Sequence, residues 1–164
     1  MKKKIAHYMK EIFIFLIFIT IFANALSLYR SNNLNQEPMS VSSFHLIDGT
    51  TYVPENNKPI LVHFWATWCP TCKAEAANIE TISKYFNVIT IATNSGDTKD
   101  IKKYLDNRNL TFKVVSDEEG SLAKMFNISI FPTTIIYDKD RAIFYSDVGY
   151  TSTFGLWIRM WLAK

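Results

Sequence analysis

Hydrophobic residues form one long run near the N-terminus and a series of short runs along the rest of the chain. The long run, residues 12–28 (IFIFLIFITIFANALSL), is just long enough to cross a bilayer as a helix, which takes about 17–25 residues. Residues 29–40 (YRSNNLNQEPMS) are polar without an apolar period, so we interpret them as a tether. The pattern predicts three parts: a signal anchor or transmembrane helix over 1–28, a tether over 29–40 and a folded domain over 41–164.

Short apolar runs alternate with helical periods throughout the predicted domain. Residues 41–53 predict a hairpin with its turn at Asp48-Gly49. Strands are expected at 59–65, 88–92, 112–116 and twice within 128–149, where 138–141 form the turn. Helices are expected to start at Cys69 and to cover 98–107, 120–126 and 152–163. This order predicts an α/β sandwich, with helices flanking a central mixed β-sheet.

Charge changes the interpretation of the N-terminus but not that of the domain. The first 30 residues hold five basic residues and one acidic residue, whereas the rest holds 13 basic and 14 acidic residues. The domain has no basic excess, so we expect no nucleic-acid partner. Lysines before a long apolar run indicate an export signal or an anchor, with the domain outside the cytoplasm. We expect a single-pass anchor in the inner (cytoplasmic) membrane and a domain facing the periplasm; the alternative is cleavage at Ala23-Asn24-Ala25.

The two cysteines of the chain, Cys69 and Cys72, follow a predicted buried strand and open a predicted helix. A structural disulfide gains most by closing a long loop, and this pair would close a very short one. A zinc site needs about four ligands, and the sequence has no second Cys-x-x-Cys and no downstream His pair, so we expect neither metal nor cofactor. A helix N-terminus favours a thiolate through its unpaired amides and its positive dipole end. The position therefore predicts a redox pair in which Cys69 attacks a partner disulfide and Cys72 resolves the mixed disulfide.

These stretches carry a family resemblance. ILVHFWATWCPTC at 60–72, FPTT at 131–134 and the order of elements resemble the thioredoxin superfamily over about residues 42–163. FWATWCPTCKAE is similar to the exported, membrane-tethered branch of TlpA-like and cytochrome c maturation (CcmG/DsbE-like) thioredoxins. VITIATNSGD and GLWIRMWLA also resemble the copper-sensitivity-suppressor (ScsD-like) protein disulfide oxidoreductases. The resemblance implies a thioredoxin-like sandwich with an added αβ unit before the cis-Pro strand, and thiol–disulfide oxidoreductase activity.

The resemblance also implies roles for residues around the cysteine pair. Cys69 and Cys72 match the redox pair, and Trp68 matches the aromatic residue that flanks it. Pro132 matches the cis-proline that faces the disulfide and helps to receive an extended substrate; cis peptides are costly away from proline. Phe131 departs from the small or β-branched residue that is commoner before this proline. It either narrows the choice of partner or only packs.

Four further features are interpreted from the sequence, three of them in two ways. His63 stands where many thioredoxins hold an acid in the strand, so it either accepts the proton of Cys72 or is a buried neutral histidine. Glu75 is expected to be a solvated helix residue, with a proton relay as the alternative. Thr133 is expected to be a strand residue whose backbone aids substrate docking. The aromatic helix at 152–163 is expected to belong to the core, with a face against the membrane or a partner as the alternative.

The sequence thus predicts a periplasmic, membrane-tethered thiol–disulfide oxidoreductase. The resemblance favours a reductase that takes electrons from a membrane thiol donor (DsbD/CcdA/ScsB-like) and reduces protein disulfides. The reverse direction, a protein-disulfide oxidant, stays open because the potential depends on the relative stability of the two redox states. A copper chaperone is the alternative from another class, since copper(I) prefers thiolates, although no His follows Cys72. A peroxidase of the peroxiredoxin kind would need a threonine where the chain has Ala66.

Overall fold

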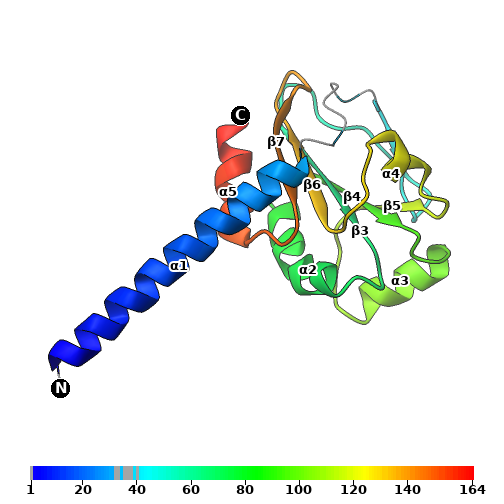
Figure 1. Cartoon of the computed structure of the whole chain (residues 1–164). Coiled ribbons are helices and arrows are strands. Elements are labelled where there is room, and N and C mark those ends of the chain that lie inside the picture. The colour runs from blue at the N-terminus through cyan, green and yellow to red at the C-terminus, as the bar shows by residue number, and fades with distance from the viewer. Residues whose placement is uncertain (1, 32–33, 35–38, 40) are drawn as a thin grey trace.

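A long N-terminal helix and an α/β domain make up the chain (Figure 1). The structure is a computed structural model, and it describes residues 2–31, 34, 39 and 41–164. Its elements in chain order are α1 (Lys2–Ser31), β1 (Phe44–His45), β2 (Thr51–Tyr52), β3 (Ile60–Trp65), α2 (Pro70–Ser83), β4 (Asn87–Thr93), α3 (Thr98–Asp106), β5 (Val114–Asp117), α4 (Ser121–Met125), β6 (Thr133–Tyr137), β7 (Ile143–Val148) and α5 (Thr153–Leu162).

Five strands form one mixed sheet in the order β5-β4-β3-β6-β7. β3 pairs in parallel with β4, β4 pairs in parallel with β5, and β6 pairs antiparallel with both β3 and β7. Every residue of β3 is buried, as an apolar run in the centre of a sheet should be. β1 and β2 form a separate hairpin. The architecture confirms the predicted sandwich, and α3 with β5 forms the added αβ unit before the cis-Pro strand.

The central sheet separates two hydrophobic cores. Successive side chains of a strand point to opposite faces, so Leu61 and Trp65 of β3 enter the core with α2, α3 and α5. Val62 and Phe64 enter the other core, with α4 and the β1–β2 hairpin. His63 has the parity of Leu61 and Trp65. Its side chain therefore faces the layer that contains α2, the helix that follows the cysteine pair.

Helix α1 contains a stretch of 20 residues, His7–Leu26, that is long and apolar enough to cross a membrane by length and composition. The helix runs on to Ser31, so the expected tether was wrong for 29–31, where no Gly or Pro stops the helix. Of the remaining tether only residues 34 and 39 are described, and the rest of that prediction lies outside the described residues. The C-terminal part of α1 lies beside β7 (Figure 1).

The boundaries of α2 differ from the predicted ones in two ways. The helix begins at Pro70, and Cys69 is its N-cap rather than its first residue. It ends at Ser83, so the apolar residue Phe86 lies beyond the helix. Phe86 is half-buried and packs edge-on against Trp157 of α5, with ring centroids 5.2 Å apart.

Candidate active site

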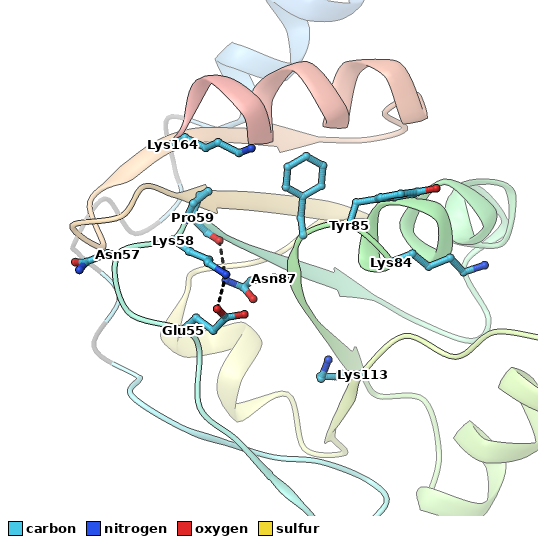
Figure 2. A pocket seen from close by; sticks show the side chains of 10 residues that line it. Glu55, Asn57, Lys58, Pro59, Lys84, Tyr85, Asn87, Lys113 and Lys164 are labelled. Carbon is cyan, nitrogen blue, oxygen red and sulfur yellow. Dashed lines mark hydrogen bonds and ion pairs between the residues drawn. The ribbon is translucent and has the colours of Figure 1, made fainter.

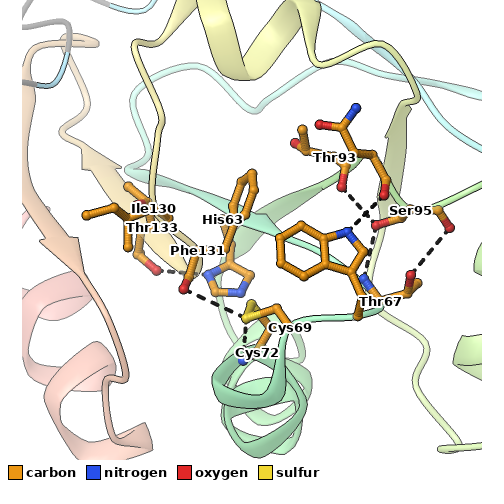
Figure 3. Close-up of a disulfide and its surroundings, with 12 residues drawn as sticks. His63, Thr67, Cys69, Cys72, Thr93, Ser95, Ile130, Phe131 and Thr133 are labelled. Carbon is orange, nitrogen blue, oxygen red and sulfur yellow. Dashed lines mark hydrogen bonds between the residues drawn. A yellow bond between two sulfur atoms is a disulfide. The ribbon is translucent and has the colours of Figure 1, made fainter.

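The two cysteines form a disulfide at the N-terminus of α2 (Figure 3). Cys69 has an extended backbone, with φ −78° and ψ 117°, and Pro70 takes the first helical position, where a missing N–H costs nothing. The amide of Cys72 donates a hydrogen bond to Sγ of Cys69 at 3.1 Å. The sulfur of Cys69 therefore caps the helix, in the place where a serine or aspartate oxygen would ordinarily do so.

The loop before the pair is held by the loop after β4. Because β3 and β4 are parallel, their carboxyl ends meet at one edge of the sheet. The indole N–H of Trp68 donates to the carbonyl oxygen of Asn94 at 3.0 Å, and the amide of Thr67 donates to Oγ of Ser95 at 3.0 Å. These bonds fix the side chain of Trp68 next to the disulfide although 59% of its surface is exposed.

The turn before β6 covers the other side of the pair. The peptide bond between Phe131 and Pro132 is cis. The carbonyl oxygen of Phe131 lies 3.7 Å from Sγ of Cys69, and the hydroxyl of Thr133 donates to the carbonyl oxygen of Ile130 at 2.7 Å. Phe131 also meets Trp68 edge-on, with ring centroids 5.9 Å apart.

An apolar surface therefore borders the pair, which is itself almost covered. Cys69 and Cys72 are 4% and 2% exposed, whereas Trp68 and Ile130 are 59% and 41% exposed. Large exposed apolar side chains beside a buried reactive group indicate a surface where another protein chain can bind and exclude water. Phe131 forms the part of this surface nearest the sulfur.

His63 lies beneath α2 and bonds to a residue that the sequence interpretation had not singled out. His63 is opposite Thr134 in the antiparallel pairing of β3 with β6, and Nδ1 lies 2.9 Å from Oγ1 of Thr134. Burial lowers the pKa of His63 from 6.5 to about 3, because the charged ring would lose its hydration. The imidazole is therefore neutral at neutral pH, and Figure 3 shows it beside Cys69 and Cys72.

Glu75, one helical turn after Cys72, is buried, so its prediction as a solvated residue was wrong. Its Oε1 accepts a hydrogen bond from the amide of Thr151 at 3.1 Å, and its Oε2 has no hydrogen-bond partner among the described residues. The pKa of Glu75 is raised from 4.5 to about 8, chiefly by burial; the hydrogen bond from the Thr151 amide opposes this rise and the nearby carboxylate of Asp147 adds to it. The carboxyl group is therefore mostly protonated at neutral pH.

The segment that covers Glu75 comes from β7 and the start of α5. The hydroxyl of Thr151 donates to Oδ2 of Asp147 at 2.7 Å, and Arg159 pairs with the same oxygen at 3.1 Å. Thr151 and Asp147 were not predicted to lie here, because they follow Glu75 by more than 70 residues and no local pattern connects them. Over the described residues, no group of three or more His, Cys, Asp or Glu side chains is placed to hold a metal ion.

The arrangement can perform disulfide exchange. A thiolate at Cys69 would be stabilised by the Cys72 amide and by the positive end of α2. The sulfur of Cys72 is bonded to that of Cys69. Two buried ionisable groups lie near the pair: His63 faces the layer that contains α2, and Glu75 is one helical turn after Cys72. The exposed apolar border supplies a surface for a protein substrate.

Comparisons with known proteins agree with this chemistry. The model of the Redoxin family matches residues 43–154. A thioredoxin-like protein of Haemophilus influenzae is 31% identical over 122 residues, which cover 72% of each chain. The thiol:disulfide interchange protein DsbE of the same organism is 32% identical over 108 residues, 63% of this chain and 60% of that one. The crystal structure of StoA from Bacillus subtilis superposes with a TM-score of 0.65 at 21% identity, over 78% of this chain and 99% of StoA.

Proposed function

The chain belongs to the Redoxin family and is a thiol–disulfide oxidoreductase, and from this premise we propose that it is a membrane-tethered reductase of protein disulfides outside the cytoplasm. The observation that carries the proposal is the disulfide at the N-cap of α2, next to the cis turn at Pro132 and an exposed apolar border. The anchor is supported by the apolar stretch His7–Leu26, which follows three lysines at positions 2–4.

In the reduced protein, Cys69 is the nucleophile. Its thiolate attacks one sulfur of a client disulfide, a new S–S bond forms, and the other client sulfur leaves as a thiolate that takes up a proton. Cys72 then loses its proton and attacks Sγ of Cys69. The Cys69–Cys72 disulfide forms, the second client thiol leaves, and two electrons have passed to the client. A membrane thiol donor of the DsbD/CcdA/ScsB type restores the dithiol by the same exchange in reverse order.

Proton transfer to and from Cys72 falls to the buried groups around it. A pKa of about 3 makes His63 a poor proton acceptor at neutral pH, so we assign it a positioning role, with its neutral ring held beneath α2 by Thr134. Glu75 has a pKa of about 8, close to ambient pH, so it can release or take up a proton at little cost during the redox cycle. The role of Glu75 requires only short-lived charge within the buried layer.

The client is an extended segment of a protein chain. The turn at Phe131 and Pro132 places a carbonyl oxygen 3.7 Å from the attacking sulfur, and the backbone of Thr133 continues from it into β6. The rings of Trp68 and Phe131 and the side chain of Ile130 contact the client on both sides of its disulfide. Phe131 is bulky for this position and restricts the residues that a client can place there.

The direction of electron flow is tested by the redox state of the pair in the native cell. Cells are quenched with acid, free thiols are alkylated, and the modified forms of the full chain are separated by mass. A mostly reduced pair in an oxidising compartment supports a reductase with a dedicated donor. A mostly oxidised pair that donates its disulfide to reduced clients would refute the proposed direction.

Activity is tested by insulin-disulfide reduction with the full chain in detergent. The wild type should reduce insulin with dithiothreitol as the donor, and Cys69→Ser should not. Copper(I) titration of the same samples separates the enzyme from a metal chaperone. If Cys72→Ser abolishes copper binding but leaves insulin reduction intact, the enzymatic role of the pair is refuted.

A further inference from the structure

Helix α5 is apolar on two opposite sides, although only one of them enters the core. Leu156, Met160 and Ala163 are at most 2% exposed and pack in the core shared with α2 and α3. The opposite side carries large apolar residues that follow the helical spacing and are 38–74% exposed: Phe154, Trp157, Ile158, Trp161 and Leu162. We name these five residues the α5 outer face. A contiguous exposed face of large apolar residues is typical of a contact with a partner or a membrane.

The α5 outer face continues into a hollow lined by lysines. Trp157 contacts Tyr85 and Phe86, with ring centroids 5.0 Å and 5.2 Å apart, and Nζ of Lys164 lies 5.7 Å from the centre of the Phe86 ring. Tyr85, Phe86 and Lys164 line a hollow of about 620 Å³ (Figure 2). Lys58, Lys84 and Lys113 line it as well, and Glu55 is the one acid among its described lining residues.

Helix α5 also lies beside the apolar helix α1. A second hollow, of about 630 Å³, is lined on one side by residues of α1 between Ile19 and Leu26 and on the other by Gly155 and Arg159 of α5. These α1 residues form the last part of the stretch that is long enough to cross a membrane. Figure 1 shows α5 alongside this part of α1. Helix α5, which carries the exposed aromatic residues, is therefore next to the level at which α1 would leave the lipid.

We propose that the α5 outer face and the lysine-lined hollow dock on the anionic surface of the membrane that α1 crosses. Trp and Tyr side chains are enriched at the interface between lipid tails and headgroups, because their apolar rings and polar groups suit both sides of it. Lysines next to such a face attract acidic headgroups, at about 1 kcal/mol for each one near the surface. The inference rests on the anchoring that is part of the proposed function.

A second copy of the chain fits this surface less well. In a two-fold symmetric dimer each patch meets its own copy. The four lysines around the hollow would then face the same four lysines of the other molecule, and among the described residues on each side only Lys58 and Lys84 are offset, by Glu55 and Glu80. An anionic lipid surface complements both the charge of the hollow and the apolar character of α5.

The test is quenching of tryptophan fluorescence in the full chain by brominated lipid. The oxidised protein is reconstituted into vesicles of three parts phosphatidylcholine to one part phosphatidylglycerol, with bromine on the acyl chains. Trp65 is buried in the core and Trp68 is held at the active site, so lipid contact should quench Trp157 and Trp161. The variant Trp157→Phe/Trp161→Phe should lose most of the quenching.

A charge reversal provides the matched comparison. Lys164→Glu at the hollow changes the charge by two units and should weaken docking about 30-fold, since each charge near the surface contributes about 1 kcal/mol. Lys99→Glu on the distant helix α3 is its control and should leave quenching unchanged. Replacing phosphatidylglycerol by phosphatidylcholine should weaken docking of the wild type more than Lys164→Glu does, because it removes the attraction for all four lysines.

Several results would overturn the inference. Quenching in the wild type no greater than in the Trp157→Phe/Trp161→Phe variant would show that the α5 outer face does not reach lipid. Unquenched emission together with a detergent-solubilised dimer that Trp161→Asp dissociates would assign the face to a second copy. Failure of docking and failure of the proposed function can be told apart. A chain that co-floats with vesicles in a density gradient and reduces insulin normally in detergent, but shows no quenching, would refute docking alone.

Discussion

Replacing Glu75 by glutamine should change how the stability of the protein depends on pH. The carboxyl group of Glu75 is fully buried, accepts one hydrogen bond from the Thr151 amide and leaves its second oxygen without a partner in the described structure. Glutamine has the same shape and no charge. The Glu75→Gln variant therefore removes the titration of this group while its side-chain oxygen can still accept the Thr151 bond.

The expected magnitude follows from the two protonation equilibria. The pKa of Glu75 is raised from 4.5 to about 8 in the folded protein, first by burial. Between these values the folded state holds a proton that the unfolded state has released, so the free energy of unfolding falls as pH rises, by about 1.4 kcal/mol per pH unit. The whole window amounts to about 5 kcal/mol of destabilisation, complete above the folded pKa. His63 acts in the opposite direction below its unfolded value of 6.5, but it is present in both proteins and cancels in their difference.

The assay is urea unfolding of the oxidised full chain in detergent, followed by tryptophan fluorescence from pH 5 to pH 9. All four tryptophans lie between residues 65 and 161, so the signal reports on the domain. The stability of Glu75→Gln relative to wild type should rise steadily to about pH 8 and then level off. Glu119→Gln, at an exposed glutamate, is the control and should show no such rise. A difference between Glu75→Gln and wild type that stays flat across this range would refute the burial argument.

The remaining predictions concern the exchange steps. Cys72→Ser should accumulate client adducts on Cys69 as mixed disulfides, visible on non-reducing gels and by mass spectrometry; a folded variant that captures none would contradict the assigned order of attack. His63→Ala should slow resolution of the mixed disulfide more than first attack, because it removes the ring that Thr134 holds beneath α2. Thr134→Val keeps the imidazole but removes its partner and should slow resolution by a smaller factor, while equal resolution rates in all three proteins would make His63 a packing residue only. Phe131→Ala should raise KM for a protein client by about 3- to 10-fold, in line with the loss of one aromatic contact, and leave the reaction with a small disulfide unchanged; equal effects on both substrates would refute a role in client choice.

Most of the fold could be predicted because its signals are local. The apolar run of β3, the Pro at the first position of α2 and the alternation of strands and helices each depend on neighbours along the chain. The sheet then follows from the rules that connect such elements. The end of α1 was misjudged because polarity was taken as the end of a helix, whereas polar residues without Gly or Pro can continue one.

The cysteine pair could also be predicted, but the environment of its buried groups could not. Thr134 lies 71 residues from His63 along the chain, and Thr151 lies 76 residues from Glu75. Their contacts depend on strand register and on how β7 leads into α5. The apolar spacing of α5 indicated a core helix, and the structure confirms this only for Leu156 and Met160 and for the C-cap residue Ala163. In the sequence, a helix with apolar residues on two sides cannot be told from a helix that is buried in a core. Only the packing in the structure shows which side is covered.

The hydrogen bond from the Cys72 amide to Sγ of Cys69 gives the molecule its own spectroscopic reporter. The acceptor of this bond is the atom that changes state: a disulfide sulfur in the oxidised form, a thiolate in the reduced form and a mixed-disulfide sulfur in between. A charged acceptor holds an amide proton more tightly than a neutral one. The nitrogen-15 and proton chemical shifts of the Cys72 amide, and its rate of exchange with deuterium, should therefore report the redox state of the pair without a chemical label on the cysteines.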